Sequence, residues 1–280
     1  MGQYRFKQVD VFSAEPLMGN PLAVVLGADD FSDERMAAFA RWTNLSETTF
    51  VLQPEHPEAD YRVRIFTTLG ELPFAGHPTL GSCHAWLENG GAAKGQVIIQ
   101  ECGIGLVKIR RQGSRLAFAA PPLLRSGPVQ PEVMARVLQG LRLKPEDVVD
   151  AQWVDNGVPW LAVRLADRAA VLGIEPDYAP MIGLDVGVFA PWDATRDGTE
   201  AHFEVRAFIA GEGMPEDPVT GSLNAGIARW LFREGLVADQ YVASQGAALG
   251  RRGRVHVQRL ADDIWIGGET VTCIDATLTL

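Results

Sequence analysis

The sequence predicts an α+β fold built from two similar halves, and three observations support that prediction. Short motifs occur twice along the chain in the same order. Each half contains one strongly apolar helix that starts at a glycine. Each half also ends in alternating, β-branched runs, which are typical of strands. We therefore expect two pseudo-symmetric domains, each a mostly antiparallel sheet rolled around a central helix.

The internal repeat consists of four pairs of motifs. The first half reads "NPLAVVL", "VRIF", "ELP" and "GHPTLGSCHAWL", and the second reads "NGVPWLAVRL", "VRAF", "EDP" and "GSLNAGIARWL". In order, these motifs begin at Asn20, Val63, Glu71 and Gly76, and at Asn156, Val205, Glu216 and Gly221. Four matches in one order and at similar spacing indicate two related domains rather than chance.

A proline-rich segment separates the two sets of motifs. Residues 121–131, "PPLLRSGPVQP", contain four prolines and a glycine, a composition typical of linkers. We therefore expect a first domain over residues 1–120, a linker over 121–131 and a second domain over 132–269. The last strand, residues 270–280, is placed so that it can pack back onto the first domain.

Composition excludes several classes of protein. The chain has 280 residues, of which 47% are hydrophobic, and a formal net charge of −10. A nucleic-acid-binding protein normally shows a basic stripe, whereas "GRRGR" (Gly250–Arg254) is the nearest candidate here and is more often a solvated turn. No apolar run approaches the roughly 20 residues of a membrane span. We therefore expect neither nucleic acid nor a membrane as partner.

The sequence carries no signature of a metal or an organic cofactor. Three widely spaced cysteines form no CxxC pair, which favours a reducing, cytoplasmic location. There is no HExxH pattern, no GxSxG elbow, no P-loop and no complete dinucleotide-binding motif. We therefore expect no metal site and no cofactor.

The starts of the two apolar helices are candidate anion-binding sites. The first turn of a helix has unpaired N–H groups and a partial positive charge, and glycine allows a ligand to approach the backbone. Gly76, Gly221 and Ser222 are therefore candidates for binding a carboxylate or phosphate. The alternative is that each glycine belongs to an ordinary helix start, with Pro78 at an allowed first-turn position.

Glu47 is the strongest single candidate for chemistry. A helix is expected from Ser32 through Met36, Phe39 and Trp42, which suit one face, and "TTFVL" then reads as a strand. Glu47 stands at this junction, where a partly desolvated carboxylate could act as a general acid and base.

Three further assignments leave an alternative open. Glu47 could complete a capping box with Asn44 as the cap. Asp217 precedes the second helix as Glu71 precedes the first, and either acid could simply complement the helix dipole. His77 could relay protons or donate a hydrogen bond, or it could be a satisfied, partly buried histidine.

Taken together, these motifs resemble the PhzF family, named for phenazine biosynthesis. The matching stretches are "GNPLAVVL", "NLSETTFVL", "RIFTTLGELPFAGHPTLG" and "EDPVTGSLNAG", and they span nearly the whole chain. The resemblance implies the diaminopimelate epimerase-like fold, with an active site in the cleft between the domains. It also implies a cofactor-independent isomerase that is usually a homodimer.

The resemblance assigns roles to particular residues. It places the catalytic glutamate at Glu47, the histidine at His77 and the aspartate at Asp217. Contacts to a substrate carboxylate fall on Gly76, Gly221 and Ser222, and Asn20 joins the expected substrate-binding residues.

The residues before the two helix-start glycines separate this chain from the related racemases. Those enzymes place a cysteine at each position, whereas Ala75 and Thr220 stand here. One carboxylate remains as a base, which favours a proton shift on one face of the substrate over inversion. Leu223 and the stretch Thr67–Leu69 depart from the family pattern near the expected pocket, which leaves the specificity open.

We therefore expect an isomerase that shifts a proton between carbons of a small carboxylate-bearing substrate, possibly one similar to dihydro-hydroxyanthranilate. The alternatives are an amino-acid racemase or epimerase of the same fold, and a non-catalytic protein that binds a small acid.

Overall fold

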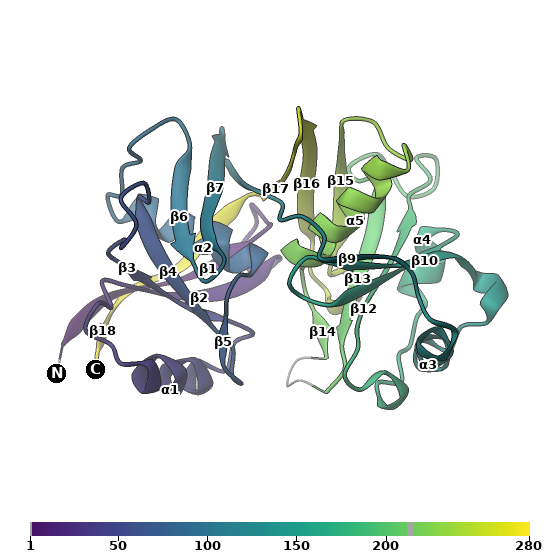
Figure 1. The fold of residues 1–280 in the computed structure, drawn as a ribbon, viewed down its shortest axis with the longest axis horizontal. Helices are drawn as coiled ribbons and strands as arrows, with labels where there is room; N and C mark the ends of the chain where they lie inside the picture. Colours follow the sequence, from purple (N-terminus) through teal and green to yellow (C-terminus); the bar gives the residue numbers. More distant parts are fainter. Residues whose placement is uncertain (1, 212–214) are drawn as a thin grey trace. The chain divides into compact units, whose positions relative to one another are not determined.

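The chain divides into two compact units in a computed structural model that describes residues 2–211 and 215–280 (Figure 1). Met1–Ala119 and Gly267–Leu280 form the first unit, and Ala120–Ile266 form the second. Each unit contains a mixed sheet, one central helix and further helical segments. In the described part of the chain, no helix is long and apolar enough to cross a membrane.

The first unit has a sheet in which the strand order is β18–β1–β2–β3–β4–β6–β7–β8. Two neighbouring pairs, β2–β3 and β4–β6, are parallel, and the other pairs are antiparallel. The short β5 pairs with the end of β4. The strands are β1 Gln3–Val11, β2 Asn20–Leu26, β3 Thr48–Leu52, β4 Tyr61–Phe66, β5 Glu71–Leu72, β6 Ile98–Cys102, β7 Gly105–Gln112, β8 Arg115–Ala119 and β18 Thr270–Thr279.

The second unit repeats this pattern with the strand order β9–β10–β11–β12–β13–β15–β16. Again two pairs are parallel, β11–β12 and β13–β15, and a short strand, β14, pairs with the end of β13. The strands are β9 Arg125–Pro128, β10 Val148–Asp155, β11 Trp160–Leu165, β12 Asp185–Pro191, β13 Phe203–Ile209, β14 Glu216–Asp217, β15 Gln240–Gln245, β16 Gly253–Leu260 and β17 Asp263–Gly268. The predicted pseudo-symmetry of the fold is confirmed.

A buried helix occupies the centre of each unit, as predicted. Helix α2, Gly76–Glu88, lies against β1, β2, β3 and β8, so the sheet curves around it, and α5, Gly221–Arg233, lies against β10, β11 and β16. Equivalent glycines permit the close approach. A Cβ atom on Gly81 would lie 2.5 Å from Leu22 Cδ2, and one on Gly226 would lie 2.5 Å from the Val154 carbonyl oxygen.

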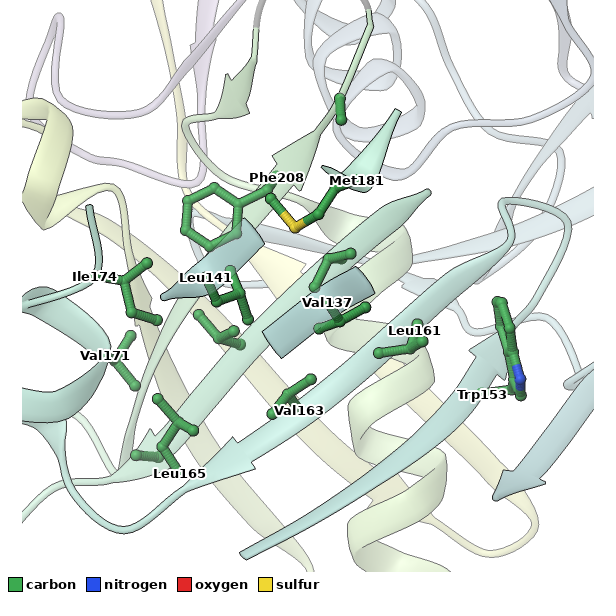
Figure 2. Packing of buried hydrophobic residues seen from close by; sticks show 14 residues of the cluster. Val137, Leu141, Trp153, Leu161, Val163, Leu165, Val171, Ile174, Met181 and Phe208 are labelled. Atoms are coloured by element: carbon green, nitrogen blue, oxygen red, sulfur yellow. The ribbon is translucent and has the colours of Figure 1, made fainter. Parts of the chain in front are cut away.

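Additional helices cover the other face of each sheet. In the first unit this is α1, Asp33–Thr43. In the second unit α3, Pro131–Leu141, and α4, Arg168–Leu172, pack on an apolar cluster that Figure 2 shows. The short 3-10 helices are η1 Pro145–Asp147, η2 Ala179–Met181 and η3 Ala247–Leu249. This burial accounts for much of the hydrophobic stabilisation of each unit.

Helix α1 corrects two details of the prediction. Met36 and Phe39 are buried as expected, but Trp42 is 77% exposed and lies off the buried face. Asn44 ends the helix in the left-handed conformation, with φ 55°, and Ser32 is the residue that caps its start. The capping-box explanation of Glu47 is therefore wrong, because Asn44 closes a helix rather than opening one.

The proline-rich segment departs from a simple linker. Residues 125–128 form β9, which pairs with β10 from Arg125 opposite Asp155 to Pro128 opposite Gln152. Pro131 then begins α3, where its fixed φ suits the first helical position. Proline is compatible with β9 because an edge strand leaves one side of its backbone unpaired.

An arginine–glutamate pair occurs at equivalent places in the two units. Arg64 donates to both oxygens of Glu71, and Arg206 donates to both oxygens of Glu216, at 2.6–2.8 Å in each case. The second pair is buried, and Arg206 also donates to two main-chain carbonyls. The first pair is more open, with the Glu71 side chain 41% exposed.

This difference in burial predicts different stabilities for two matched variants. Glu216→Ala leaves a buried guanidinium without its counter-charge and should lower the free energy of unfolding by about 3–5 kcal/mol. Glu71→Ala breaks an exposed pair and should cost less than about 1 kcal/mol. Urea unfolding followed by circular dichroism measures both values. Equal losses in the two variants would contradict this assignment.

Candidate active site

Three predicted site residues of the first unit lie together. His77 is the second residue of α2, and its Nε2 atom lies 3.3 Å from Oε2 of Glu47. Its other ring nitrogen, Nδ1, lies 3.3 Å from Nδ2 of Asn20. Asn20 is fully buried, His77 is 4% exposed, and the Glu47 side chain is 15% exposed. The histidine therefore connects an amide with a nearly buried carboxylate.

The sheet register explains why these residues meet. Asn20 is the first residue of β2, and Glu47 directly precedes β3. Because β2 and β3 are parallel, with Ala23 opposite Thr48, both strands begin at the same edge of the sheet. The first turn of α2, which holds Gly76 and His77, reaches the same place, as the contacts of His77 show.

The hydrogen-bond pattern assigns the histidine proton. An amide nitrogen donates and does not accept, so Nδ1 of His77 accepts from Asn20. Nε2 of the neutral imidazole then carries the proton and lies 3.3 Å from Oε2 of Glu47, close enough for an electrostatic contact but without the alignment of a hydrogen bond. The uncharged imidazole therefore presents an N–H, and not a lone pair, on the side of the Glu47 carboxylate.

Buried polar side chains support the first turn of α2. Thr79 Oγ1 donates to the carbonyl of Ala75 at 2.9 Å and accepts from Gln100 Nε2 at 3.1 Å. Gln100 in turn accepts from the Tyr61 hydroxyl at 2.8 Å. Tyr61, Thr79 and Gln100 are at most 1% exposed. This chain of hydrogen bonds attaches the helix start to β4 and β6.

The predicted residues of the second unit gather at the start of α5. Asp217 is buried, and one of its carboxylate oxygens accepts from the Thr220 hydroxyl at 2.5 Å. Gln245 accepts from the Thr220 backbone N–H at 3.0 Å and from Asn224 at 2.9 Å. It also donates to the Asp217 carbonyl and to the Thr220 hydroxyl. Gln245 thus fixes the segment from Asp217 to the first turn of α5.

Ser222 is positioned by two residues that the sequence prediction missed. The indole N–H of Trp160 donates to the Ser222 hydroxyl oxygen at 2.9 Å, and Asn156 donates to the Ser222 carbonyl at 2.8 Å. Because the indole can only donate, the Ser222 proton must point elsewhere. Ser222 can therefore donate its own hydrogen bond to an anionic ligand.

The repeat itself contained a signal for Asn156. Each half has an asparagine shortly before its "LAV" stretch, and each asparagine contacts the residue after a helix-start glycine. Asn20 contacts His77, and Asn156 contacts Ser222. The repeat thus pairs Asn156 with Asn20, although only Asn20 was expected to belong to the site.

The strand register confirms the pairing of Glu71 with Glu216 in the repeat and places Asp217 one residue beyond it. Phe66 lies opposite Glu71, and Phe208 lies opposite Glu216. Glu216 is therefore the counterpart of Glu71, and Leu72 is the counterpart of Asp217. The acid at position 217 is therefore not part of the repeat, and complementation of the α5 dipole by Asp217 stays an alternative explanation.

The structure thus places the predicted residues in two groups. Asn20, Glu47, Gly76 and His77 belong to the first unit, and Asp217, Gly221 and Ser222 belong to the second. That all seven serve one reaction stays a prediction. Within residues 2–211 and 215–280, no cluster of three or more histidine, cysteine or acidic residues is arranged to hold a metal ion.

A duplicated unit of a rolled sheet around a central helix is the diaminopimelate epimerase-like fold. The model of the family described as "Phenazine biosynthesis-like protein" matches residues 9–276. The chain therefore belongs to the PhzF family, and the expected family, fold and enzyme class, an isomerase, are confirmed.

Two relatives and two solved structures illustrate the likeness. The chain is 32% identical to trans-2,3-dihydro-3-hydroxyanthranilate isomerase of Pseudomonas aeruginosa, over 98% of this chain and 95% of the relative. It is 34% identical to antisense-enhancing sequence 1 of Schizosaccharomyces pombe, over 98% of each. A PhzF family structure from Enterococcus faecalis superposes with a TM-score of 0.81 at 24% identity, over 100% of both chains. A hydroxyproline epimerase from Agrobacterium vitis gives 0.60 at 14% identity, over 99% of this chain and 92% of that one, and shows the fold alone.

The hydrogen bonds of Gln245 predict a large effect of its removal. Gln245→Ala leaves the Thr220 N–H, the Asn224 amide and the Asp217 carbonyl without this partner. Each buried group that loses its partner costs about 1–3 kcal/mol, so we expect the free energy of unfolding to fall by about 2–4 kcal/mol. Gln240→Ala, at the exposed start of the same strand, is the control and should change it by less than about 0.5 kcal/mol. Urea denaturation distinguishes the two variants, and a Gln245→Ala variant as stable as Gln240→Ala would refute the assigned network.

Proposed function

We propose that this protein is a cofactor-independent isomerase that moves a proton between carbons of a small carboxylate-bearing substrate, with Glu47 as the acid and base. A substrate similar to trans-2,3-dihydro-3-hydroxyanthranilate, the compound named for the Pseudomonas aeruginosa relative, is the proposed class. The arrangement of Asn20, His77 and Glu47 is the observation that supports this proposal most directly.

The proposed step conserves atoms and electrons within the substrate. The Glu47 carboxylate accepts a proton from one carbon, and the electron pair of that C–H bond moves into the substrate's π system. Glu47, now a carboxylic acid, returns the proton to a different carbon. His77 donates from Nε2 and stabilises the carboxylate between turnovers, and Asn20 holds the imidazole in that tautomer. The net change is a shifted double bond.

The helix starts supply donors for the anionic end of the substrate. Gly76 and Gly221 each begin a helix whose first N–H groups have no partner within the helix. Ser222 has a hydroxyl proton that it does not use toward Trp160. In this proposal these groups bind the carboxylate, and Asp217 orients an amino or hydroxyl group of the substrate.

A comparison of the units favours a proton shift over racemisation. Ala23 lies opposite Thr48, and the equivalent Ala162 lies opposite Gly187. The residue equivalent to Glu47 is therefore Val186, which cannot transfer a proton. Inversion by two bases needs an acid or a thiol on each face of the substrate; neither Val186 nor Thr220 provides one, and this proposal gives the second acid, Asp217, the role of orienting the substrate.

Replacing Glu47 tests the proposed chemistry. Glu47→Gln keeps the side-chain size but removes the base, so the rate of isomerisation should fall by at least about 10²-fold. The measurement is solvent deuterium incorporation and product formation in D2O with trans-2,3-dihydro-3-hydroxyanthranilate as the probe. Glu71→Gln, which alters the exposed pair with Arg64, is the control and should stay within about two-fold of the wild type.

Two results would contradict the proposal in different ways. Deuterium incorporation by Glu47→Gln at the wild-type rate would remove Glu47 from the reaction. A wild-type protein whose melting temperature rises with the probe, but which leaves the probe unchanged, would instead indicate a binding protein.

We also propose that the chain forms a homodimer, as its family membership suggests. Sedimentation velocity at micromolar concentration should then give a mass close to twice the 30.4 kDa of one chain. A single species at 30.4 kDa across the concentration series would reject the dimer.

A further inference from the structure

A buried aspartate holds the turn that leads from β1 into Asn20. Asp10 is 2% exposed, and its Oδ2 atom accepts the backbone N–H of Gly19 at 2.9 Å. Gly19 is buried and directly precedes Asn20, the first residue of β2. A buried backbone N–H needs a hydrogen-bond partner. Asp10 supplies that partner and so fixes the chain at the residue before Asn20.

The packing of this turn leaves the backbone little freedom. A Cβ atom on Gly19 would collide with the Val11 carbonyl oxygen and would lie 3.2 Å from Asp10 Oδ1. Val11 lies opposite Asn20 in the β1–β2 register. Phe12, which follows, is fully buried with φ 67°, a conformation that few residues other than glycine adopt. Such a conformation persists where the surrounding structure holds it, and it is typical of functional sites.

A second aspartate makes the same kind of contact in the second unit. Asp155, the last residue of β10, accepts the backbone N–H of Gly157 at 2.8 Å. Gly157 directly follows Asn156, whose side chain donates to the Ser222 carbonyl. In each unit, therefore, an aspartate holds a glycine beside the asparagine that contacts the start of the central helix. The contact in the second unit is exposed, whereas the one made by Asp10 is buried.

The contact between Asn20 and His77 depends on an accurate placement of the asparagine. Its 3.3 Å distance is already at the long end of the range for a hydrogen bond, so a small shift of Asn20 would break it. Without that donor, either ring nitrogen of His77 can carry the proton. A proton on Nδ1 would leave the lone pair of Nε2 on the side of the Glu47 carboxylate.

We propose that Asp10 is a positioning residue, whose carboxylate holds Gly19 and thereby keeps Asn20 where it fixes the His77 proton on Nε2. The effect on the tautomer concerns the first unit alone. The effect on turnover rests on the proposed function, in which His77 stands beside the base Glu47.

Nitrogen NMR of the histidine rings tests the tautomer without any assay of activity. At about pH 8.5, above the ordinary histidine pKa of about 6.5, wild-type His77 should carry its proton on Nε2 alone. Asp10→Ala should give a mixture of the two tautomers, and His77→Gln identifies the signals. Asp29→Ala is the matched control and should leave the tautomer unchanged, because Asp29 accepts the Gln53 N–H at an exposed place in the same unit. A wild type with the proton on Nδ1, or an Asp10→Ala variant with the proton on Nε2 alone, would overturn the proposal.

An isosteric variant covers the case in which Asp10→Ala does not fold. Asp10→Asn has an amide oxygen that can accept from the Gly19 N–H, so it should keep the proton of His77 on Nε2. An Asp10→Asn variant that folds but gives a mixture of tautomers would show that hydrogen-bond acceptance is not what matters. That result, or a failure of Asp10→Asn to fold, would reject the positioning role.

Turnover shows whether Asp10 acts through Asn20. With trans-2,3-dihydro-3-hydroxyanthranilate as the probe, Asp10→Ala should lower kcat at least about ten-fold and change KM much less, because a misplaced site group mainly slows the reaction step. Asp29→Ala should stay within about two-fold of the wild type. Adding Asp10→Ala to Asn20→Ala should lower kcat by less than about two-fold further, since the side chain through which Asp10 acts is already absent. Losses that multiply in the double variant would reject the route through Asn20.

The two readouts separate this inference from the proposed function. A wild type that is inert toward the probe, with a tautomer that shifts in Asp10→Ala, would reject the proposed function and keep the positioning role. An active wild type, with neither the tautomer nor kcat changed in Asp10→Ala, would reject the positioning role alone.

Discussion

The burial of one helix inside each rolled sheet is the constraint on which the rest of the structure depends. The first turn of such a helix has N–H groups and side chains that cannot all reach bulk water, so the surrounding strands must supply their partners. In the first unit Gln100 reaches the helix through Thr79, and in the second Gln245 binds Thr220 directly. The proposed anion site depends on these same fixed polar groups, because donors that are already oriented need no rearrangement when a ligand arrives.

The architecture was predictable because its signals are local and occur twice. Apolar periodicity, helix-start glycines and the repeated motif order are all visible within short windows, and each half supports the interpretation of the other. Errors arose where one residue type serves two purposes. Asparagine is favoured both as an N-cap and as the left-handed residue that ends a helix, so Asn44 could not be assigned before the end of α1 was known. Trp42 suited the apolar face by its spacing from Phe39. The buried face is centred on Met36, Phe39 and Ala40, however, and the helix turns position 42 away from it, so the side chain is exposed.

The candidate site was predictable only in part. Glu47, His77 and Asp217 belong to recognisable stretches, and the contacts of Asn20 and Glu47 with His77 join residues that lie far apart in the sequence but are fixed by parallel strand pairing. Gln245 and Trp160 come from strands in which nothing nearby marks them as partners of α5, so tertiary structure was needed to find them.

Packing also explains why the two halves of a duplicated scaffold differ in chemistry. Leu223, which the sequence marked as unusually bulky, packs against Gly187, where a Cβ atom would lie 2.4 Å from Leu223 Cδ1. Gly187 and Leu223 are the counterparts of Thr48 and Pro78, and the neighbouring Val186 is fully buried. A carboxylate at Val186 would therefore be desolvated within an apolar environment, whereas Glu47 has His77 beside it and part of its surface open. The packing of the second unit therefore disfavours a carboxylate at Val186, the position equivalent to Glu47. Of the two positions made equivalent by strand register, only Glu47 carries a carboxylate, and the candidate acid of the second unit, Asp217, lies instead at the start of α5.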